Sequence, residues 1–173
     1  MNDQSSPKVL VSAGSKYGST AEIARHMADR LERAGLDVVF RPPSEAGELG
    51  SYDAIVLGSA VYVGHWTSDA MELARAIGRL APKPPVWIFS SGPIGDSPKP
   101  TEDPVDVSEV LTLTEAREHR VFKGKIDKSK LSFGEKAILI AVRAAEGDYR
   151  DWDAVNEWTD AIAEELVREE IGA

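Results

Sequence analysis

The chain has 173 residues, of which 42% are hydrophobic and 28% are charged. This length suffices for one domain with a hydrophobic core, and the composition is that of a globular protein rather than a disordered one. The formal net charge of −9 argues against nucleic acid and anionic membranes as partners, because like charges repel. The lack of cysteine excludes disulfides and thiol catalysis, and the three histidines are scattered, so we expect no metal site.

The sequence carries no segment that we interpret as a targeting signal or a membrane span. Residues 1–8 are mostly polar and lead directly into a strand-like run, so we expect no cleaved leader. The longest purely aliphatic run, Ala137–Val142, is far too short to cross a bilayer. We therefore expect a cytoplasmic protein without a transmembrane segment, in which residues 1–173 form one domain with an ordered core at 7–171.

The first part of the chain alternates short apolar runs with helical patterns. A continuous apolar run predicts a strand at Lys8–Ala13 that is buried on both faces. An amphipathic stripe predicts a helix after it, and Ser19 and Glu22 have the spacing of a capping box at its start. A short second strand is predicted at Val38–Phe40 and a third at Ala54–Val63.

The same alternation continues to the end of the chain. The helix expected after the third strand begins with Trp66 on its apolar face, so we interpret this side chain as part of the core. Proline and acidic residues predict an irregular loop at Gly92–Val107. The other expected elements are a strand at Pro85–Ser90, a helix at Val107–Glu118, a strand at Arg120–Lys123, a helix at Glu135–Ala145 and a last helix from Asp151 or Asp153.

Five strands with intervening helices indicate one α/β domain with a parallel sheet. Crossover connections between parallel strands are right-handed by strong preference. Ligands of such sheets bind at the carboxyl ends of the strands, at the point where the strand order changes direction. The loops after the first, third and fourth strands are therefore the candidate ligand-binding segments.

The loop after the first strand has the residue types of an anion-binding site. Small hydroxyl residues and glycines fill the segment from Gly14 to Thr20, and a helix begins at once. Backbone N–H groups, the helix dipole and the hydroxyls together favour a phosphate there. The segment matches neither the triphosphate-binding P-loop nor the glycine fingerprint of dinucleotide folds. A capped tight turn without a ligand is the alternative interpretation.

The loop resembles the phosphate motif of the flavodoxin family, in which Thr or Ser is followed after one residue by Thr-Gly and, after one more, by Thr. Ser15, Gly18 and Thr20 match this motif, whereas Tyr17 stands where the family usually has threonine. The resemblance runs over nearly the whole chain. It implies a flavodoxin-like three-layer sandwich with a five-stranded parallel sheet in the order 2-1-3-4-5, and it implies bound flavin mononucleotide (FMN).

The resemblance also implies which residues surround the cofactor. Six residues of the first loop are expected at the phosphate: Ser15, Lys16, Tyr17, Gly18, Ser19 and Thr20. The loop after the third strand is expected against one side of the flavin ring, through Ala60, Val61, Tyr62, Gly64 and His65. Backbone amides of Ser91 and Gly92 are expected at the pyrimidine edge of the ring.

One branch of the family offers a finer comparison. The step Gly64-His65-Trp66 is similar to that of the branch containing menaquinone-dependent protoporphyrinogen oxidase, in which a basic residue is also familiar at the position of Lys16. The region before the last helix is long and basic in that branch. Here Lys123–Lys136 is rich in lysine and precedes the apolar Ala137–Val142. For this region we favour a solvated loop followed by a helix packed on the sheet.

The function implied by the resemblance is that of an FMN-dependent oxidoreductase or electron carrier, in which the flavin supplies the chemistry. The redox donor and acceptor stay open, with a quinone or a tetrapyrrole as candidates. No nucleophile elbow accompanies these features. The alternative is a non-redox binding or scaffold module that has lost FMN, because one fold serves many functions and because Tyr17 and Val63 depart from the family pattern.

Overall fold

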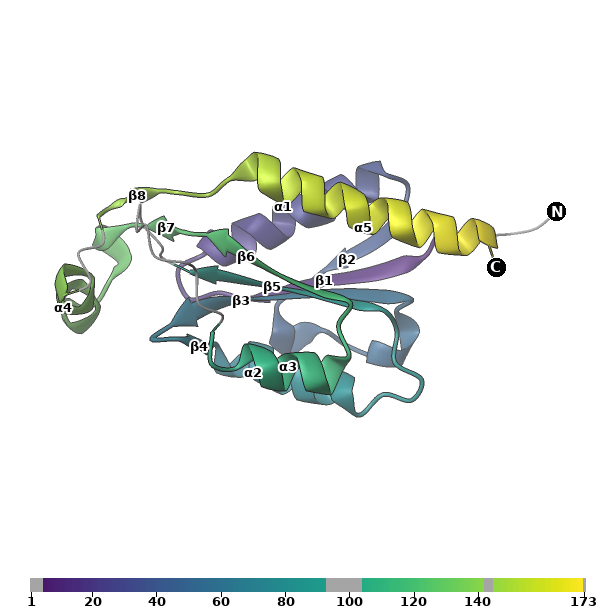
Figure 1. Ribbon diagram of the computed structural model, residues 1–173, viewed down its shortest axis with the longest axis horizontal. Helices are drawn as coiled ribbons and strands as arrows, with labels where there is room; N and C mark the ends of the chain where they lie inside the picture. Colours follow the sequence, from purple (N-terminus) through teal and green to yellow (C-terminus); the bar gives the residue numbers. More distant parts are fainter. Residues whose placement is uncertain (1–4, 93–103, 142–144, 173) are drawn as a thin grey trace.

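The computed structural model describes residues 5–92, 104–141 and 145–172. Figure 1 shows three layers, in which a central sheet is covered by α1 and α5 on one face and by α2 and α3 on the other. These helices span Ser19–Arg33 (α1), Ser68–Gly78 (α2), Val107–Thr114 (α3) and Trp152–Gly172 (α5). In the described part of the chain, no helix is both long and apolar enough to cross a membrane.

The central sheet is parallel along the path β2-β1-β3-β5-β6. Since β4 is only a short strand beside β3, this path is the predicted order 2-1-3-4-5, and the flavodoxin-like expectation is confirmed. The inner strands are buried because helices cover both faces of the sheet, as their continuous apolar runs predict. The strands span Asp37–Phe40 (β2), Lys8–Gly14 (β1), Ala54–Tyr62 (β3), Val86–Gly92 (β5) and Glu118–Lys123 (β6).

The largest aromatic cluster of the core joins α5 to the sheet. Trp158 of α5 packs against Phe89 of β5 and Phe122 of β6, with ring centroids 6.2 and 5.6 Å away. Trp87 is also buried in β5. Both tryptophans belong to the hydrophobic core on this face of the sheet. Gly58 of β3 belongs to the same packing, because a Cβ at this position would lie 2.1 Å from the Phe89 ring.

The predicted capping box at the start of α1 is wrong. The N-cap is Gly18, at φ 93°, and no side chain caps the helix there. Ser19 is already the first helical residue, and its Oγ accepts instead from the backbone N of Lys125 at 3.2 Å. Glu22 pairs with Arg150 rather than with the N-cap. Gly18 makes the turn into the helix in a left-handed conformation, which glycine adopts at no steric cost.

Trp66 is buried, as expected, but it does not begin a helix. It lies in β4 (His65–Trp66), which returns antiparallel along the end of β3. The indole Nε1 donates to Ser90 Oγ at 2.9 Å, so this ring belongs to the interior and does not face a ligand. The reversal is made by Val63 and Gly64, both with positive φ, and α2 begins only at Ser68.

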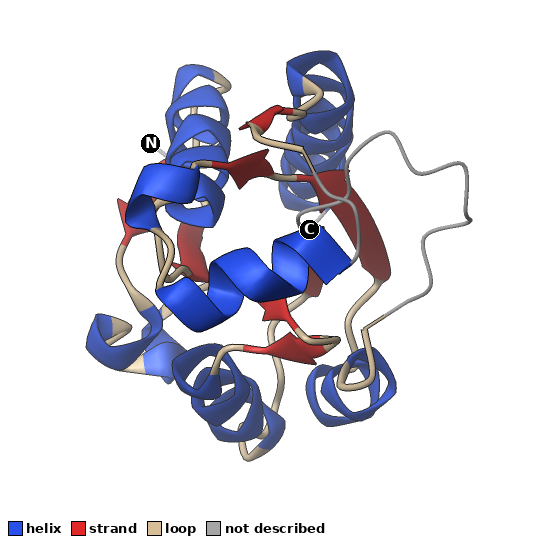
Figure 2. Cartoon of the chain, turned by 90° about the vertical axis from the view of Figure 1, so that its left-hand side faces the viewer, coloured by secondary structure: helices blue, strands red, loops and turns tan. Residues whose placement is uncertain are grey.

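The apolar helix near residue 135 is not packed on the sheet, so this expectation is wrong. Figure 2 shows α4 (Phe133–Ala141) crossing in front of the carboxyl end of the sheet. The short paired strands β7 (Lys125–Ile126) and β8 (Gly147–Asp148) carry this segment outward. The sheet face next to α5 is already covered by α1 and α5, which leaves no uncovered place for α4 there.

Other boundaries differ by a few residues from the expectation. β3 ends at Tyr62, α3 ends at Thr114 and β6 begins at Glu118. Most of the irregular loop predicted at Gly92–Val107 lies outside the described residues. The helix predicted at Glu135–Ala145 is described from Phe133 to Ala141; residues 142–144 lie outside the described ranges, and Ala145 is not helical. These shifts leave the order of the elements unchanged.

Candidate functional site

A cavity of about 360 Å³ opens at the carboxyl ends of β1, β3 and β5. The sheet order changes direction between β1 and β3, so the cavity lies where parallel α/β sheets place their ligands. Ten of the residues predicted for the site line it: Ser15, Lys16, Tyr17, Ser19, Thr20, Ala60, Val61, Tyr62, Ser91 and Gly92. The predicted residues outside this lining are Gly18, Gly64 and His65.

The loop between β1 and α1 forms the polar end of the cavity. Ser15 Oγ accepts from Gly18 N at 3.1 Å, and the left-handed Gly18 turns the chain into α1. The first helical hydrogen bond runs from Glu22 N to the carbonyl of Gly18 at 2.9 Å. The N–H groups before Glu22 therefore have no acceptor within the helix and carry the positive end of its dipole. With the hydroxyls of Ser19 and Thr20, this end of the cavity suits an anion.

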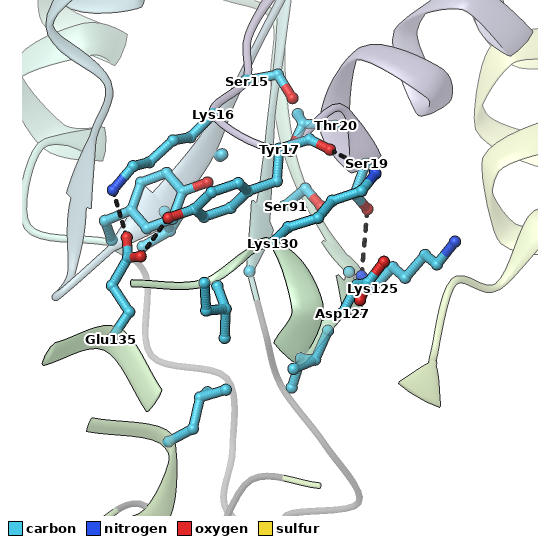
Figure 3. A pocket seen from close by; sticks show the side chains of 18 of the residues that line it. Ser15, Lys16, Tyr17, Ser19, Thr20, Ser91, Lys125, Asp127, Lys130 and Glu135 are labelled. Atoms are coloured by element: carbon cyan, nitrogen blue, oxygen red, sulfur yellow. Dashed lines mark hydrogen bonds and ion pairs between the residues drawn. The ribbon is translucent and has the colours of Figure 1, made fainter. Parts of the chain in front are cut away.

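An aromatic and charged cluster occupies the other side of the cavity (Figure 3). The carboxylate of Glu135, from α4, accepts hydrogen bonds from Lys16 Nζ and from the Tyr17 hydroxyl. The Tyr17 and Tyr62 rings meet edge to face at 6.2 Å, and Lys16 Nζ lies 5.1 and 5.5 Å from their centroids. Tyr17 thus replaces the small hydroxyl of the family motif with a group that ties the loop to α4.

Hydrogen bonds and burial shift the titration of this cluster. The pKa of Glu135 falls to about 2, first because Lys16 and Tyr17 donate to the carboxylate and then because Ser132 N does. The same contact with Glu135 raises the pKa of Lys16. Burial raises the pKa of Tyr62 to about 12, and the neighbouring Tyr17 adds to this shift. At neutral pH the cluster therefore holds one ion pair beside a protonated phenol.

We expect the ligand-free protein to show a late tyrosine ionisation that belongs to Tyr62. Because the folded-state pKa of Tyr62 is about 12, above the ordinary 10.0, its contribution to stability is complete below pH 10 and is lost as the pH rises through 12. The measurement is the ultraviolet absorbance of tyrosinate, with circular dichroism recorded at each pH to detect unfolding. Tyr62→Phe should remove the late step, whereas Tyr149→Phe should keep it; persistence of the step in Tyr62→Phe contradicts the assignment.

A third wall comes from the segment between β6 and α5, which the sequence did not place in the site. Lining residues of this segment are Gly124, Lys125, Ile126, Asp127, Lys130, Leu131, Glu135 and Leu139. Ser132 and Glu135 form a capping box at the start of α4, with Ser132 N donating to Glu135 at 2.8 Å. This Ser-x-x-Glu spacing is visible in the sequence, but nothing local indicates that the Glu135 carboxylate also contacts Lys16 and Tyr17.

Gly64 and His65 serve a different contact. His65 is exposed, and its Nδ1 lies 3.2 Å from Asp106, whose carboxylate also accepts from Trp66 N at 2.9 Å. The Gly64 carbonyl accepts from Val105 N at 2.8 Å. These contacts tie the turn after β3 to the start of α3. Val63, which precedes them, is 82% exposed and holds the left-handed conformation that β-branched residues rarely adopt.

The chemistry of the lining differs between the two ends of the cavity. Hydroxyls and the open end of α1 gather at one end, whereas the rest is lined by apolar side chains, tyrosine rings and the Lys16–Glu135 ion pair. At the polar end the left-handed Gly18 turns the loop into α1. At the other end the carboxyl ends of strands β3 and β5 bring backbone groups to the cavity. This donor set fits an elongated ligand with a flat aromatic part and an anionic tail, which is the form of a flavin mononucleotide.

Comparisons with known proteins agree on a flavodoxin-like domain. The model of the flavodoxin domain family matches residues 10–153. No significant match was found among curated proteins. Among solved structures, the rubredoxin:oxygen oxidoreductase of Desulfovibrio gigas has a TM-score of 0.66 at 18% identity, over 98% of this chain and 39% of that one. The chain therefore spans well under half the length of that enzyme.

Flavodoxins of similar size also share the fold. A flavodoxin mutant from Pseudomonas aeruginosa has a TM-score of 0.58 at 20% identity, with 92% of this chain and 98% of that chain covered. A flavodoxin from Streptococcus pneumoniae has a TM-score of 0.59 at 19% identity, with 94% and 99% covered. At these identities the solved structures show likeness of fold alone.

Proposed function

The chain belongs to the flavodoxin domain family, and on that premise we propose that it binds FMN in the cavity at the carboxyl ends of β1, β3 and β5. One observation carries the proposal: a single cavity joins the open end of α1, with its hydroxyls, to a slot lined by apolar and aromatic side chains. The first part suits a phosphate and the second a flat heterocycle. The protein then works as an FMN-dependent oxidoreductase or electron carrier.

The roles of the chain's own residues follow from their places in the cavity. Ser15, Ser19 and Thr20, with the first amides of α1, hold the phosphate. The backbone around Tyr62 and the carboxyl end of β5 at Ser91 orient the flavin ring and limit the access of water to it. Bound FMN supplies the redox chemistry, and the surrounding groups set how readily it takes up electrons.

A finer candidate is oxidation of protoporphyrinogen with a quinone as acceptor. What supports it is the additional wall from the segment between β6 and α5, where the apolar Ile126, Leu131 and Leu139 lie beside Lys125. Such a wall suits a large apolar substrate that carries carboxylates. The test is anaerobic turnover of protoporphyrinogen by the FMN-loaded protein with and without a quinone; an unchanged rate relative to free FMN rules this candidate out.

The experiment for the general proposal is a titration of the purified protein with FMN and with riboflavin. We expect flavin absorbance to survive desalting after FMN is added, flavin fluorescence to change on binding, and the midpoint of thermal unfolding to rise. Ligand at one hundred times its Kd should stabilise the fold by about 2.7 kcal/mol. If neither flavin binds and the midpoint does not move, the redox proposal fails and the alternative of a scaffold module without FMN takes its place.

A further inference from the structure

We propose that Lys130 supplies a cation to the phosphate of FMN and makes the cavity prefer FMN over riboflavin; this inference rests on the proposed function. Lys130 belongs to the short 3-10 turn Lys128–Lys130, which lies more than one hundred residues after the phosphate loop. Its side chain lines the cavity together with Ser15, Ser19 and Thr20. Figure 3 shows the chain of Lys130 reaching toward Tyr17 and Ser19 at the start of α1.

The turn that carries Lys130 is fastened to the phosphate loop. Asp127 caps the turn by accepting from Ser129 N at 3.0 Å. Two residues earlier, the backbone N of Lys125 donates to Ser19 Oγ at 3.2 Å. Lys125 also lies opposite Asp148 in the backbone pairing of the antiparallel strands β7 and β8. These contacts hold the turn that carries Lys130 beside the phosphate loop.

Within the described chain Lys130 has no ion-pair partner that fixes its side chain, although its charge acts on the carboxylate of Asp127. Its Nζ has a contact of 3.5 Å with the carbonyl of Tyr17, at the long limit of a hydrogen bond. The group also faces the positive end of the α1 dipole, which disfavours a cation. An anion placed between Nζ and the first amides of α1 would be attracted by both. A phosphate is the anion that the proposed ligand provides.

The other charged groups of the lining are engaged elsewhere. Lys16 pairs with Glu135 at the opposite side of the cavity, and Glu22 pairs with Arg150. The Lys125 side chain points away from the phosphate loop in Figure 3. Asp127 interacts electrostatically with Lys130, but its carboxylate is held by the Ser129 hydroxyl at 2.5 Å and by Ser129 N. Lys130 is thus the lysine of the described lining that is directed to the phosphate end.

The test compares Lys130→Ala with Lys128→Ala, which removes an exposed lysine of the same turn that does not line the cavity. We expect Lys130→Ala to raise the Kd for FMN about tenfold in low salt, because a hydrogen-bonded ion pair is lost. The Kd for riboflavin, which has no phosphate, should not change. The loss should shrink as salt is added, since Lys130 is exposed to solvent and its attraction is screened. Lys128→Ala should leave both constants unchanged.

The outcomes separate the two proposals. If wild-type protein binds neither flavin, the proposed function fails, and the role of Lys130 fails with it. If wild-type protein binds FMN but Lys130→Ala binds it equally well, or loses FMN and riboflavin to the same extent, only the role of Lys130 is overturned. Thermal unfolding of both lysine variants without ligand checks that neither substitution has changed the fold.

Discussion

Replacing Trp158 by alanine is expected to lower the free energy of unfolding by about 3–5 kcal/mol. The side chain is 3% exposed and joins α5 to the sheet through Phe89 and Phe122. Its Nε1 also donates to Glu118 at 2.8 Å, so truncation leaves a cavity and removes this hydrogen bond. The two surrounding rings belong to neighbouring strands of the sheet, β5 and β6, and have little freedom to close over the space.

Chemical unfolding in urea, followed by circular dichroism, measures this loss. Trp152→Ala is the matched control, because Trp152 begins the same helix but is only half buried, with its ring 4.8 Å from His26. We expect the control to lose clearly less stability than Trp158→Ala. Trp158→Phe should recover much of the loss, since it keeps an aromatic ring in the cluster. Equal losses for the two alanine variants would show that Trp158 is not the main link between α5 and the sheet.

The strands and helices that form this core could be predicted from the sequence because each depends on the hydrophobic pattern of its own residues. Continuous apolar runs such as Lys8–Ala13 predict strands covered on both faces, and period-3.6 stripes predict the helices that cover them. Trp87 and Trp158 follow from the same patterns, and both are buried. The order of the strands in the sheet has no such local signal, and it was available only through the family resemblance.

The features that the sequence analysis placed wrongly, above all α4, depend on contacts between residues far apart in the chain. Lys16 and Tyr17 meet Glu135 across more than one hundred positions, and no local pattern indicates that α4 lies over the cavity. The exposed Phe133, at 91%, makes α4 an unusual helix for a covered sheet face. At the start of α1 the sequence contains two residues that could serve as the N-cap. Ser19 has a side chain suited to capping, but the left-handed Gly18 is the N-cap in the structure. Sequence spacing alone does not decide between them.

The double substitution Ser15→Ala with Thr20→Val is expected to weaken FMN binding by about two to four orders of magnitude. A hydrogen bond to a charged group contributes about 1.5–3 kcal/mol, so each lost hydroxyl corresponds to at least tenfold in Kd. Both residues line the polar end of the cavity, and Thr20 is buried beneath it. Valine keeps the shape of threonine, so the second change removes the hydroxyl with little loss of packing. Fluorescence titration with FMN measures the effect.

Riboflavin provides the control that decides what the double variant means. Ser15 Oγ also accepts from Gly18 N at 3.1 Å, so its removal disturbs the loop as well as the phosphate contacts. A disturbed loop that displaced the ring would weaken both flavins, whereas loss of phosphate contacts weakens FMN alone. We therefore expect the Kd of riboflavin to change little and the preference for FMN to fall by most of the total effect. Equal weakening of both flavins would mean that these hydroxyls shape the loop and do not bind phosphate.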